Sequence, residues 1–297
     1  MNSARSWPQM TSPAQRLRPL MLALGLFAVL IGSGCQAPRA AVSEQDIDLA
    51  DFVQQQTSRA GLLRLLESGG TIEIRTKDED GSDFQDCALE LWRDGERFAL
   101  RLRKLGERFL WVGSNGVDWW VFELTADPVR LVVLPSGGDG QQALGSELLL
   151  FGPDQLLQLA GLQPVALETA VARWSDDDSQ IRVEFPTTDG GSWSRMVWYL
   201  DPETRLPERI EALDAEGTVV LESALDNYEP IRARDQPVGN WPQFPRKLRV
   251  RTPDGAIDVR LFFNRPGATG SKLRDALFDL DLLMKTFKPG IIEYVKK

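Results

Sequence analysis

Hydrophobic and polar residues alternate along most of this chain after residue 70, in runs of about seven residues that end in turns. TIEIRTK, which begins at Thr71, places its two isoleucines on one face. RFALRLRK (97–104) places Phe and Leu residues on one face and arginines on the other. Such alternation is typical of strands with one buried face. Because Asp-Gly and Asn-Gly pairs are strong hairpin signals, Asp94-Gly95 and Asn115-Gly116 between these runs predict an antiparallel meander.

Three segments have a helical pattern instead. The first is Leu49–Ser68, whose apolar residues recur at helical spacing. GPDQLLQLAGL (152–162) has Pro153 at the expected first helical position and ends at a glycine, and Ser271–Lys285 begins with a serine cap. Between the first two helices, the Pro- and Gly-rich segment 134–146 is predicted to be a loop.

Six more alternating runs lie between residues 180 and 263, among them QIRVEF, PERIEAL and RKLRVRT. Roughly a dozen strands and three helices predict a mainly β, α+β fold. We expect one strongly curved antiparallel sheet, an incomplete β-barrel, with helices covering its concave face. Residues 49–297 are expected to form this single domain.

Aromatic residues gather in two of the predicted strands. In FLWVGSNGVDWWVFEL (109–124), alternation places Phe109 and Trp111 on one face, and Trp119 and Trp120 on opposite faces. Both faces of the second strand are therefore bulky and apolar, so something must cover each of them. WSRMVWYL (193–200) repeats the pattern. The candidate residues for a lipid-binding cavity are Trp111, Trp119, Trp120, Met196 and Trp198. Two interpretations stay open: a filled core, or a cavity wide enough for acyl chains.

Charge and composition narrow the classes of function. All 43 acidic residues follow Cys35 but three of the 34 basic residues precede it, which leaves a net charge of −12 from Cys35 onward. Such a surface repels nucleic-acid phosphates. The sequence has no histidine, which excludes Ser-His-Asp and Cys-His catalysis and histidine-ligated zinc. WSDDDSQ (174–180) lacks the glycine and distant glutamate of a calcium loop and predicts a solvated turn. We expect no catalytic residue, metal or cofactor, and a buried, structural Cys87.

The first 34 residues have the pattern of a secretory signal. Three arginines precede an uncharged apolar run, residues 20–31, which is too short to span a bilayer as a helix. Gly32-Ser33-Gly34-Cys35 resembles the lipobox of bacterial lipoproteins, although Gly32 stands where that motif usually has Leu, Val or Ala. The resemblance implies that Cys35 carries a diglyceride and a further acyl chain such as palmitate, and that 35–48 is a tether. The alternative is an ordinary signal peptide with a chance cysteine.

Two longer stretches resemble the LolA/LolB-like lipoprotein-carrier superfamily. LELWRDGERFALRLRKLGERFLWVGSNGVDWWVFEL (89–124) is similar to the early strands of that family, and WYLDPETRLPERIEALDAEGTVVLESALDNYEPI (198–231) to its most recognisable stretch. The helix at 152–162 falls where the family has a central helical insertion. The likeness covers residues 50–265. It implies an incomplete barrel whose mouth is plugged by helices around a hydrophobic cavity, and a protein that binds rather than catalyses.

Three functions follow from this resemblance and these residues. The leading hypothesis is an envelope protein, anchored through Cys35, that binds lipid or lipoprotein acyl chains for transport, sorting or sensing. The alternative is a structural or sensory lipoprotein with a filled core and a protein partner. A carboxylate-dependent hydrolase ranks third, because no converging carboxylate pair is evident. Gln36 is not the aspartate that often retains lipoproteins at the inner membrane, so the periplasmic face of the outer membrane is expected.

Overall fold

The computed structural model describes residues 47–77, 81–135, 152–165, 167–187, 193–233, 236–268 and 273–295. The chain divides into two compact units, residues 1–46 and 47–297, and every described residue belongs to the second unit. The described part of this unit holds fourteen strands in one sheet and three α-helices. The predicted class, mainly β with helices, is confirmed.

The elements have the following bounds. The α-helices are α2 (Leu49–Leu62), α3 (Pro153–Leu159) and α4 (Leu280–Phe287). The first seven strands are β1 (Leu65–Lys77), β2 (Ser82–Asp94), β3 (Arg97–Lys104), β4 (Glu107–Ser114), β5 (Asp118–Glu123), β6 (Arg130–Pro135) and β7 (Val171–Trp174). The last seven are β8 (Ile181–Pro186), β9 (Arg195–Leu200), β10 (Pro207–Leu213), β11 (Val219–Pro230), β12 (Gln243–Arg251), β13 (Ile257–Ala268) and β14 (Ile291–Tyr294).

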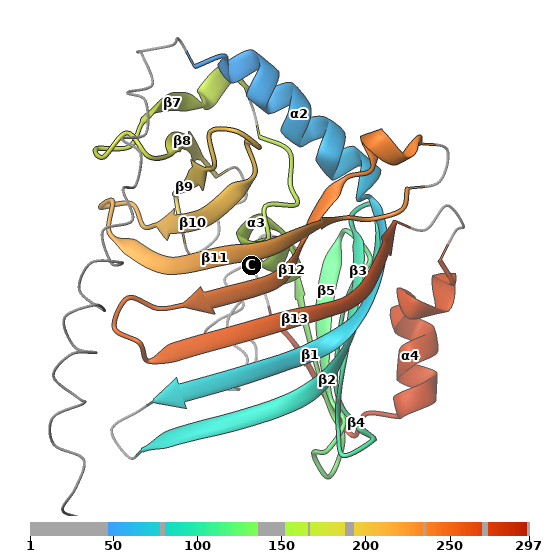
Figure 1. Ribbon diagram of the computed structural model, residues 1–297. Helices are drawn as coiled ribbons and strands as arrows, with labels where there is room; N and C mark the ends of the chain where they lie inside the picture. Colours follow the sequence, from blue (N-terminus) through green and yellow to red (C-terminus); the bar gives the residue numbers. More distant parts are fainter. Residues whose placement is uncertain are drawn as a thin grey trace, which may run out of the picture. The chain divides into compact units, whose positions relative to one another are not determined.

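The sheet consists of two meanders joined side by side. Its order is β14-β6-β5-β4-β3-β2-β1-β13-β12-β11-β10-β9-β8-β7, so β1 pairs with β13 at the junction. Among the described strands only β14, which lies beside β6, pairs in parallel; all other pairs are antiparallel. The sheet curves strongly without closing, because β14 and β7 remain its edges (Figure 1). This matches an incomplete barrel.

The hairpin signals in the sequence are confirmed, but the first helix is shorter than predicted. Gly95 and Gly116 both have positive φ, which glycine adopts without a steric penalty. Helix α2 is capped by Asp48, whose Oδ1 accepts a hydrogen bond from the Asp51 N–H at 2.9 Å. It ends at Leu62, so the prediction of helix through Ser68 was wrong. The last residues of that segment instead begin β1, where backbone pairing with both β2 and β13 outweighs the helical propensity of leucine.

The C-terminal helix also differs from its prediction. The expected start at Ser271 lies outside the described residues, and residues 275–277 form a short 3₁₀ turn rather than α-helix. Helix α4 begins only at Leu280, because Asp279 caps it through a hydrogen bond to the Leu282 N–H at 3.0 Å. Most of the predicted loop 134–146 is also outside the described residues, and its first two residues belong to β6.

Two apolar cores lie on opposite faces of the sheet. The larger one, here called the inner core, is built from the inward faces of strands of both meanders together with α2 and α3, including Phe52 and Leu156. The smaller outer core joins β3–β6 to α4 through residues such as Phe122 and Leu283. Figure 1 shows α3 within the curve of the sheet and α4 on its outer side. Helix α4 is therefore an exception to the expectation that the helices cover the concave face.

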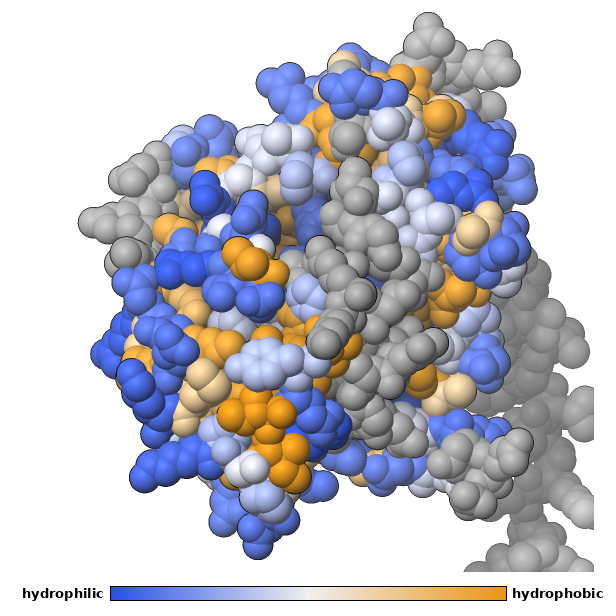
Figure 2. Space-filling view, turned by 180° about the vertical axis from the view of Figure 1, so that it is seen from behind, coloured by the Kyte–Doolittle hydropathy of each residue, from blue (hydrophilic) through white to orange (hydrophobic). Residues whose placement is uncertain are grey.

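The surface agrees with the acidic composition. Seen from behind, this unit is mostly hydrophilic, with apolar residues in several separate patches (Figure 2). The edge strand β14 contributes exposed Ile291, Ile292 and Tyr294. Within the described residues no helix has the length and apolarity needed to cross a membrane.

One carboxylate in the sheet predicts a pH dependence of stability. Asp258 accepts two hydrogen bonds from Arg249 at 2.8 Å and one from Arg260 at 3.2 Å. Burial alone would raise the pKa of Asp258, but these arginines outweigh it and hold the pKa below its ordinary value. A carboxylate with a lowered folded-state pKa stabilises the fold above its unfolded pKa, and this contribution is lost as the pH falls through the folded pKa.

Asp258→Asn is therefore expected to lower the free energy of unfolding at pH 7, and to match the wild type more closely as the pH falls below about 4. Urea unfolding at pH 7 and pH 3 measures both differences. Exposed Glu216→Gln is the control, with little effect at either pH. A difference between wild type and Asp258→Asn that grows toward acid would contradict the prediction.

Candidate functional site

Three of the five candidate lipid-binding residues face the inner core. Met196 and Trp198 alternate into it from β9, and both are almost fully buried. The Trp198 ring meets the edge of Phe52 on α2, with ring centroids 6.4 Å apart. Trp119 on β5 lies against the start of α3, because a Cβ added at Gly152 would stand 3.5 Å from its ring. These residues therefore pack where the curved sheet meets α2 and α3.

The other two candidates, Trp111 and Trp120, lie on the opposite face, in the outer core beneath α4. Phe287 of α4 packs against Trp111, with ring centroids 5.8 Å apart. The prediction that both faces of β5 must be covered is confirmed. The prediction that Phe109 shares a face with Trp111 was wrong: a register shift in the β3–β4 pairing turns Phe109 toward the inner core.

Buried polar side chains fasten the C-terminal end of α3. Three carbonyl oxygens there accept hydrogen bonds from three different parts of the chain. Ser223 on β11 donates to the Leu159 carbonyl at 2.7 Å, Arg93 on β2 donates to the Leu162 carbonyl at 3.2 Å, and Arg59 on α2 donates to the Gly161 carbonyl. Each donor is buried. These donors connect the end of α3 to both α2 and the sheet. A hydrogen bond from a charged group, such as those of Arg59 and Arg93, contributes about 1.5–3 kcal/mol.

Burial shifts the pKa values of the groups around this junction. It lowers the pKa of Arg59, an effect that nearby Tyr228 opposes. It lowers the pKa of Arg93 to about 10, so Arg93 is still charged at neutral pH. Burial also raises the pKa of Tyr228 to about 12, and the Tyr228 hydroxyl donates to the Pro207 carbonyl at 2.6 Å. Arg93 and Tyr228 therefore keep their ordinary protonation states at neutral pH.

The inner core contains small internal spaces. A void of about 30 Å³ lies beneath the start of α3, and its lining is almost entirely apolar. A second space of about 70 Å³ borders Met196 and Trp198, where Gln158 and Thr187 add polar groups. Ligand pockets usually measure about 300–1,000 Å³, so in this conformation neither space holds an acyl chain.

Arg59, Arg93 and Ser223 were not among the residues predicted from the sequence. One signal was present for Arg59. Together with Gln56 it falls on the apolar face of α2, in line with Phe52 and Leu63, and a polar residue on such a face must find partners when buried. Arg93 and Ser223 carry no comparable signal, because each is an ordinary polar residue in an alternating strand.

The structure also describes the other residues that were considered for reactive or metal-binding roles, except Cys35. Cys87 is a free, buried thiol, and burial raises its pKa. The WSDDDSQ segment forms the predicted turn between β7 and β8, where Asp177 accepts hydrogen bonds from Ser175 and Ser179. Cys35 lies outside the described residues. Within the described part of the chain, no group of three or more Cys, Asp or Glu side chains has the arrangement of a metal site.

Comparison with known proteins identifies the fold through structure and not through sequence. No family model matches the sequence, and no curated protein sequence matches it. A DUF1329 family protein from Desulfovibrio piger superposes with a TM-score of 0.55 at 13% identity, covering 79% of this chain and 98% of the other.

Two further solved structures share this fold. A domain named for outer membrane lipoprotein sorting, from Vibrio parahaemolyticus, has a TM-score of 0.52 at 13% identity and covers 76% of this chain and 94% of the other. The LolA superfamily protein NE2245 from Nitrosomonas europaea has a TM-score of 0.50 at 14% identity, with coverage of 77% and 98%. This chain therefore has a LolA-like fold, as the sequence resemblance predicted.

Proposed function

We propose that this chain, which has the fold of the LolA superfamily, is a lipid-anchored protein of the bacterial envelope that binds acyl chains of lipids or lipoproteins. The observation that carries the proposal is the inner core itself. One continuous apolar cluster lines the space between the curved sheet and helices α2 and α3, which we propose cover its concave face, and it leaves unfilled voids beside α3. The structural neighbours named for lipoprotein sorting and LolA support the same assignment.

The two spaces that described residues bound in the inner core are too small for an acyl chain, and we propose that binding displaces α3. The voids of about 30 and 70 Å³ mark where the packing beneath α3 is incomplete. Helix α3 is short, and the polar contacts made by Arg59, Arg93 and Ser223 hold its C-terminal end. Burying a sixteen-carbon chain contributes roughly 12 kcal/mol before ordering costs, which exceeds the contribution of these contacts.

The N-terminal segment supplies the membrane anchor in this proposal. Residues 1–34 serve as the signal peptide, Cys35 carries the lipid, and residues 35–48 form the tether. Each buried CH₂ contributes about 0.8 kcal/mol, so two or three chains on Cys35 hold the protein on a membrane firmly. The domain then works from the periplasmic face of the outer membrane. Its acidic exterior keeps it from adhering to anionic headgroups.

The test is mass spectrometry of lipids that co-purify, without detergent, with the chain carrying Cys35→Ser. We expect about one acylated molecule per protein and uptake of a fluorescent fatty acid. Two Val→Phe substitutions on opposite faces of the sheet locate the binding site. Val112→Phe fills the void in the inner core. Val133→Phe adds the same side-chain volume to the outer core. Both overpack a core, but only Val112→Phe is expected to abolish uptake.

A lipid-free protein that takes up no fatty acid would overturn the proposal. It would favour the second candidate function, a structural or sensory lipoprotein that binds a protein partner. One observation favours that candidate: the side chains of the inner core are almost fully buried, and the spaces left between them are small.

A further inference from the structure

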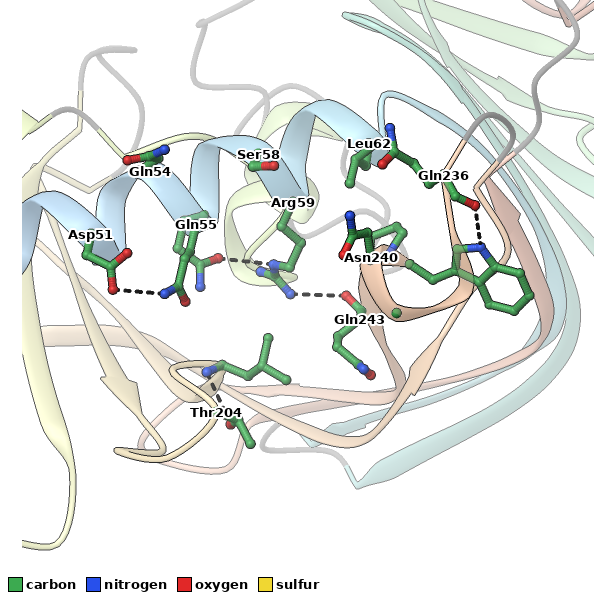
Figure 3. A pocket seen from close by; sticks show the side chains of 15 residues that line it. Asp51, Gln54, Gln55, Ser58, Arg59, Leu62, Thr204, Gln236, Asn240 and Gln243 are labelled. Carbon is green, nitrogen blue, oxygen red and sulfur yellow. Dashed lines mark hydrogen bonds between the residues drawn. The ribbon is translucent and has the colours of Figure 1, made fainter.

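A polar cleft lies between α2 and the segments that face it, outside the inner core. Its volume is about 520 Å³, within the range of small-molecule pockets. One wall is α2, and the other comes from residues 204–206 and 236–243. Figure 3 shows Arg59 extending from α2 toward Gln243, with Asp51 and Gln55 farther along the same helix and Thr204 opposite.

The cleft is rich in neutral hydrogen-bonding groups. Six of its lining residues carry side-chain amides: Gln54, Gln55, Gln56, Gln236, Asn240 and Gln243. Ser58 and Thr204 add hydroxyls, and Trp241 adds an aromatic ring. Amides both donate and accept hydrogen bonds, so these walls suit a polar, hydrogen-bonding ligand rather than a hydrocarbon chain.

Among the described residues, Arg59 gives the cleft a positive charge that no carboxylate offsets. The two charged residues in its lining are Arg59 and Asp51, and Asp51 already forms an ion pair with Arg205. Arg59 donates hydrogen bonds to the Gln56 Oε1 atom at 3.0 Å, the Gln243 carbonyl at 3.5 Å and the Gly161 carbonyl. Its guanidinium carbon also lies 6.0 Å from the centroid of the Tyr228 ring, and all of these groups are neutral. No acidic side chain among the described residues pairs with Arg59.

An arginine that is 7% exposed and has no anionic partner is costly, because burial removes its hydration without supplying a counter-charge. A bound anion would supply that charge, and the guanidinium fork matches the geometry of phosphate oxygens. We propose that this cleft binds the phosphate of a small polar headgroup, with Arg59 contacting the phosphate and the amides contacting the rest. This cleft lies outside the inner core and shares with the acyl site only Arg59, which also holds α3, and its proposed ligand goes beyond the proposed function.

The test uses isothermal titration of the full chain carrying Cys35→Ser with glycerol 3-phosphate, and with glycerol as the uncharged control. We expect glycerol 3-phosphate to bind and glycerol not to bind. Arg59→Gln is expected to weaken binding at least tenfold, since it removes a charge-assisted contact. Because Arg59 also supports the fold, a matched pair on the exposed face of α2 keeps the test independent of folding.

Ser58→Glu places a carboxylate in the cleft, and Thr57→Glu places the same charge on the neighbouring exposed residue outside it. We expect Ser58→Glu to weaken glycerol 3-phosphate binding about tenfold and Thr57→Glu to change it less than twofold. Equal effects of the two variants, or no binding of glycerol 3-phosphate at millimolar concentration, would overturn the proposal.

A second ligand distinguishes the source of the phosphate. Dihexanoyl phosphatidic acid that binds more tightly than glycerol 3-phosphate, with the same loss in Ser58→Glu, assigns the cleft to lipid headgroups; equal affinities assign it to a free phosphate ester. Fatty-acid uptake in Ser58→Glu is expected to equal that of the unsubstituted protein. These measurements therefore distinguish an absence of phosphate binding in the cleft from an absence of fatty-acid binding in the inner core.

Discussion

Replacing Gly70 with alanine is expected to lower the free energy of unfolding by about 3 kcal/mol or more, whereas the same change at Gly69 leaves it within about 0.5 kcal/mol. Gly70 lies in β1, where β13 approaches so closely that a Cβ would stand 2.1 Å from the Phe262 carbonyl oxygen. That oxygen belongs to a paired backbone and cannot move alone. A Cβ at Gly69 would meet its nearest atoms at 3.9 Å, an ordinary contact distance.

Urea unfolding followed by far-UV circular dichroism measures both variants against the wild type. The two glycines are adjacent and share strand β1, so they have the same strand propensity, and their comparison isolates the close approach of β13. Equal stability of the two variants would show that β1 and β13 separate easily at this point. That result would contradict the β1–β13 pairing described above.

Leu283→Ala is expected to lower the free energy of unfolding by about 3 kcal/mol, within the range of about 2–5 kcal/mol for a leucine truncated in a core. Leu283 is 5% exposed and is one of the α4 residues in the outer core with Trp111 and Trp120. Its neighbour Leu282 is 42% exposed, so Leu282→Ala is expected to cost less than about 0.5 kcal/mol.

Near-UV circular dichroism and thermal unfolding follow this second pair. The loss in Leu283→Ala is expected to be accompanied by a weaker aromatic signal, because Phe287 of α4 packs against both Trp111 and Phe122. A stability of Leu283→Ala equal to that of Leu282→Ala would mean that α4 is not fixed on β3–β6. The tryptophans of the outer face would then be open to other partners.

Strand alternation predicted most of the sheet, because one or both faces of nearly every strand are buried. The errors lie where local pattern and tertiary pairing disagree. Leucines at 65 and 66 fit a helix or a strand equally well, and only pairing with β2 and β13 decides the matter. The residue pair Gly69-Gly70 looks like a turn in the sequence, although it lies inside β1 and allows β13 to approach.

The candidate site was predictable only in part for the same reason. Alternation correctly placed Trp119 and Trp120 on opposite faces of β5, but it does not say which face lies inside the curve. The residues that fasten α3 are separated from it by about 60 to 100 positions in the chain, and no local pattern connects them to it. The register shift at Phe109 turns this side chain to the other face of the sheet, and the spacing of apolar residues in the sequence does not indicate it.

The junction of β1 with β13 sets the order in which the domain is completed. The first meander, β1–β6, can pair within itself early, but β1 then presents an open edge until β13 is available, more than 180 residues later in the chain. Contacts of such separation form slowly, and an unpaired strand edge invites association with other chains. Until β13 pairs with it, the edge of β1 is therefore the place where the partly folded domain is most exposed to association with other chains.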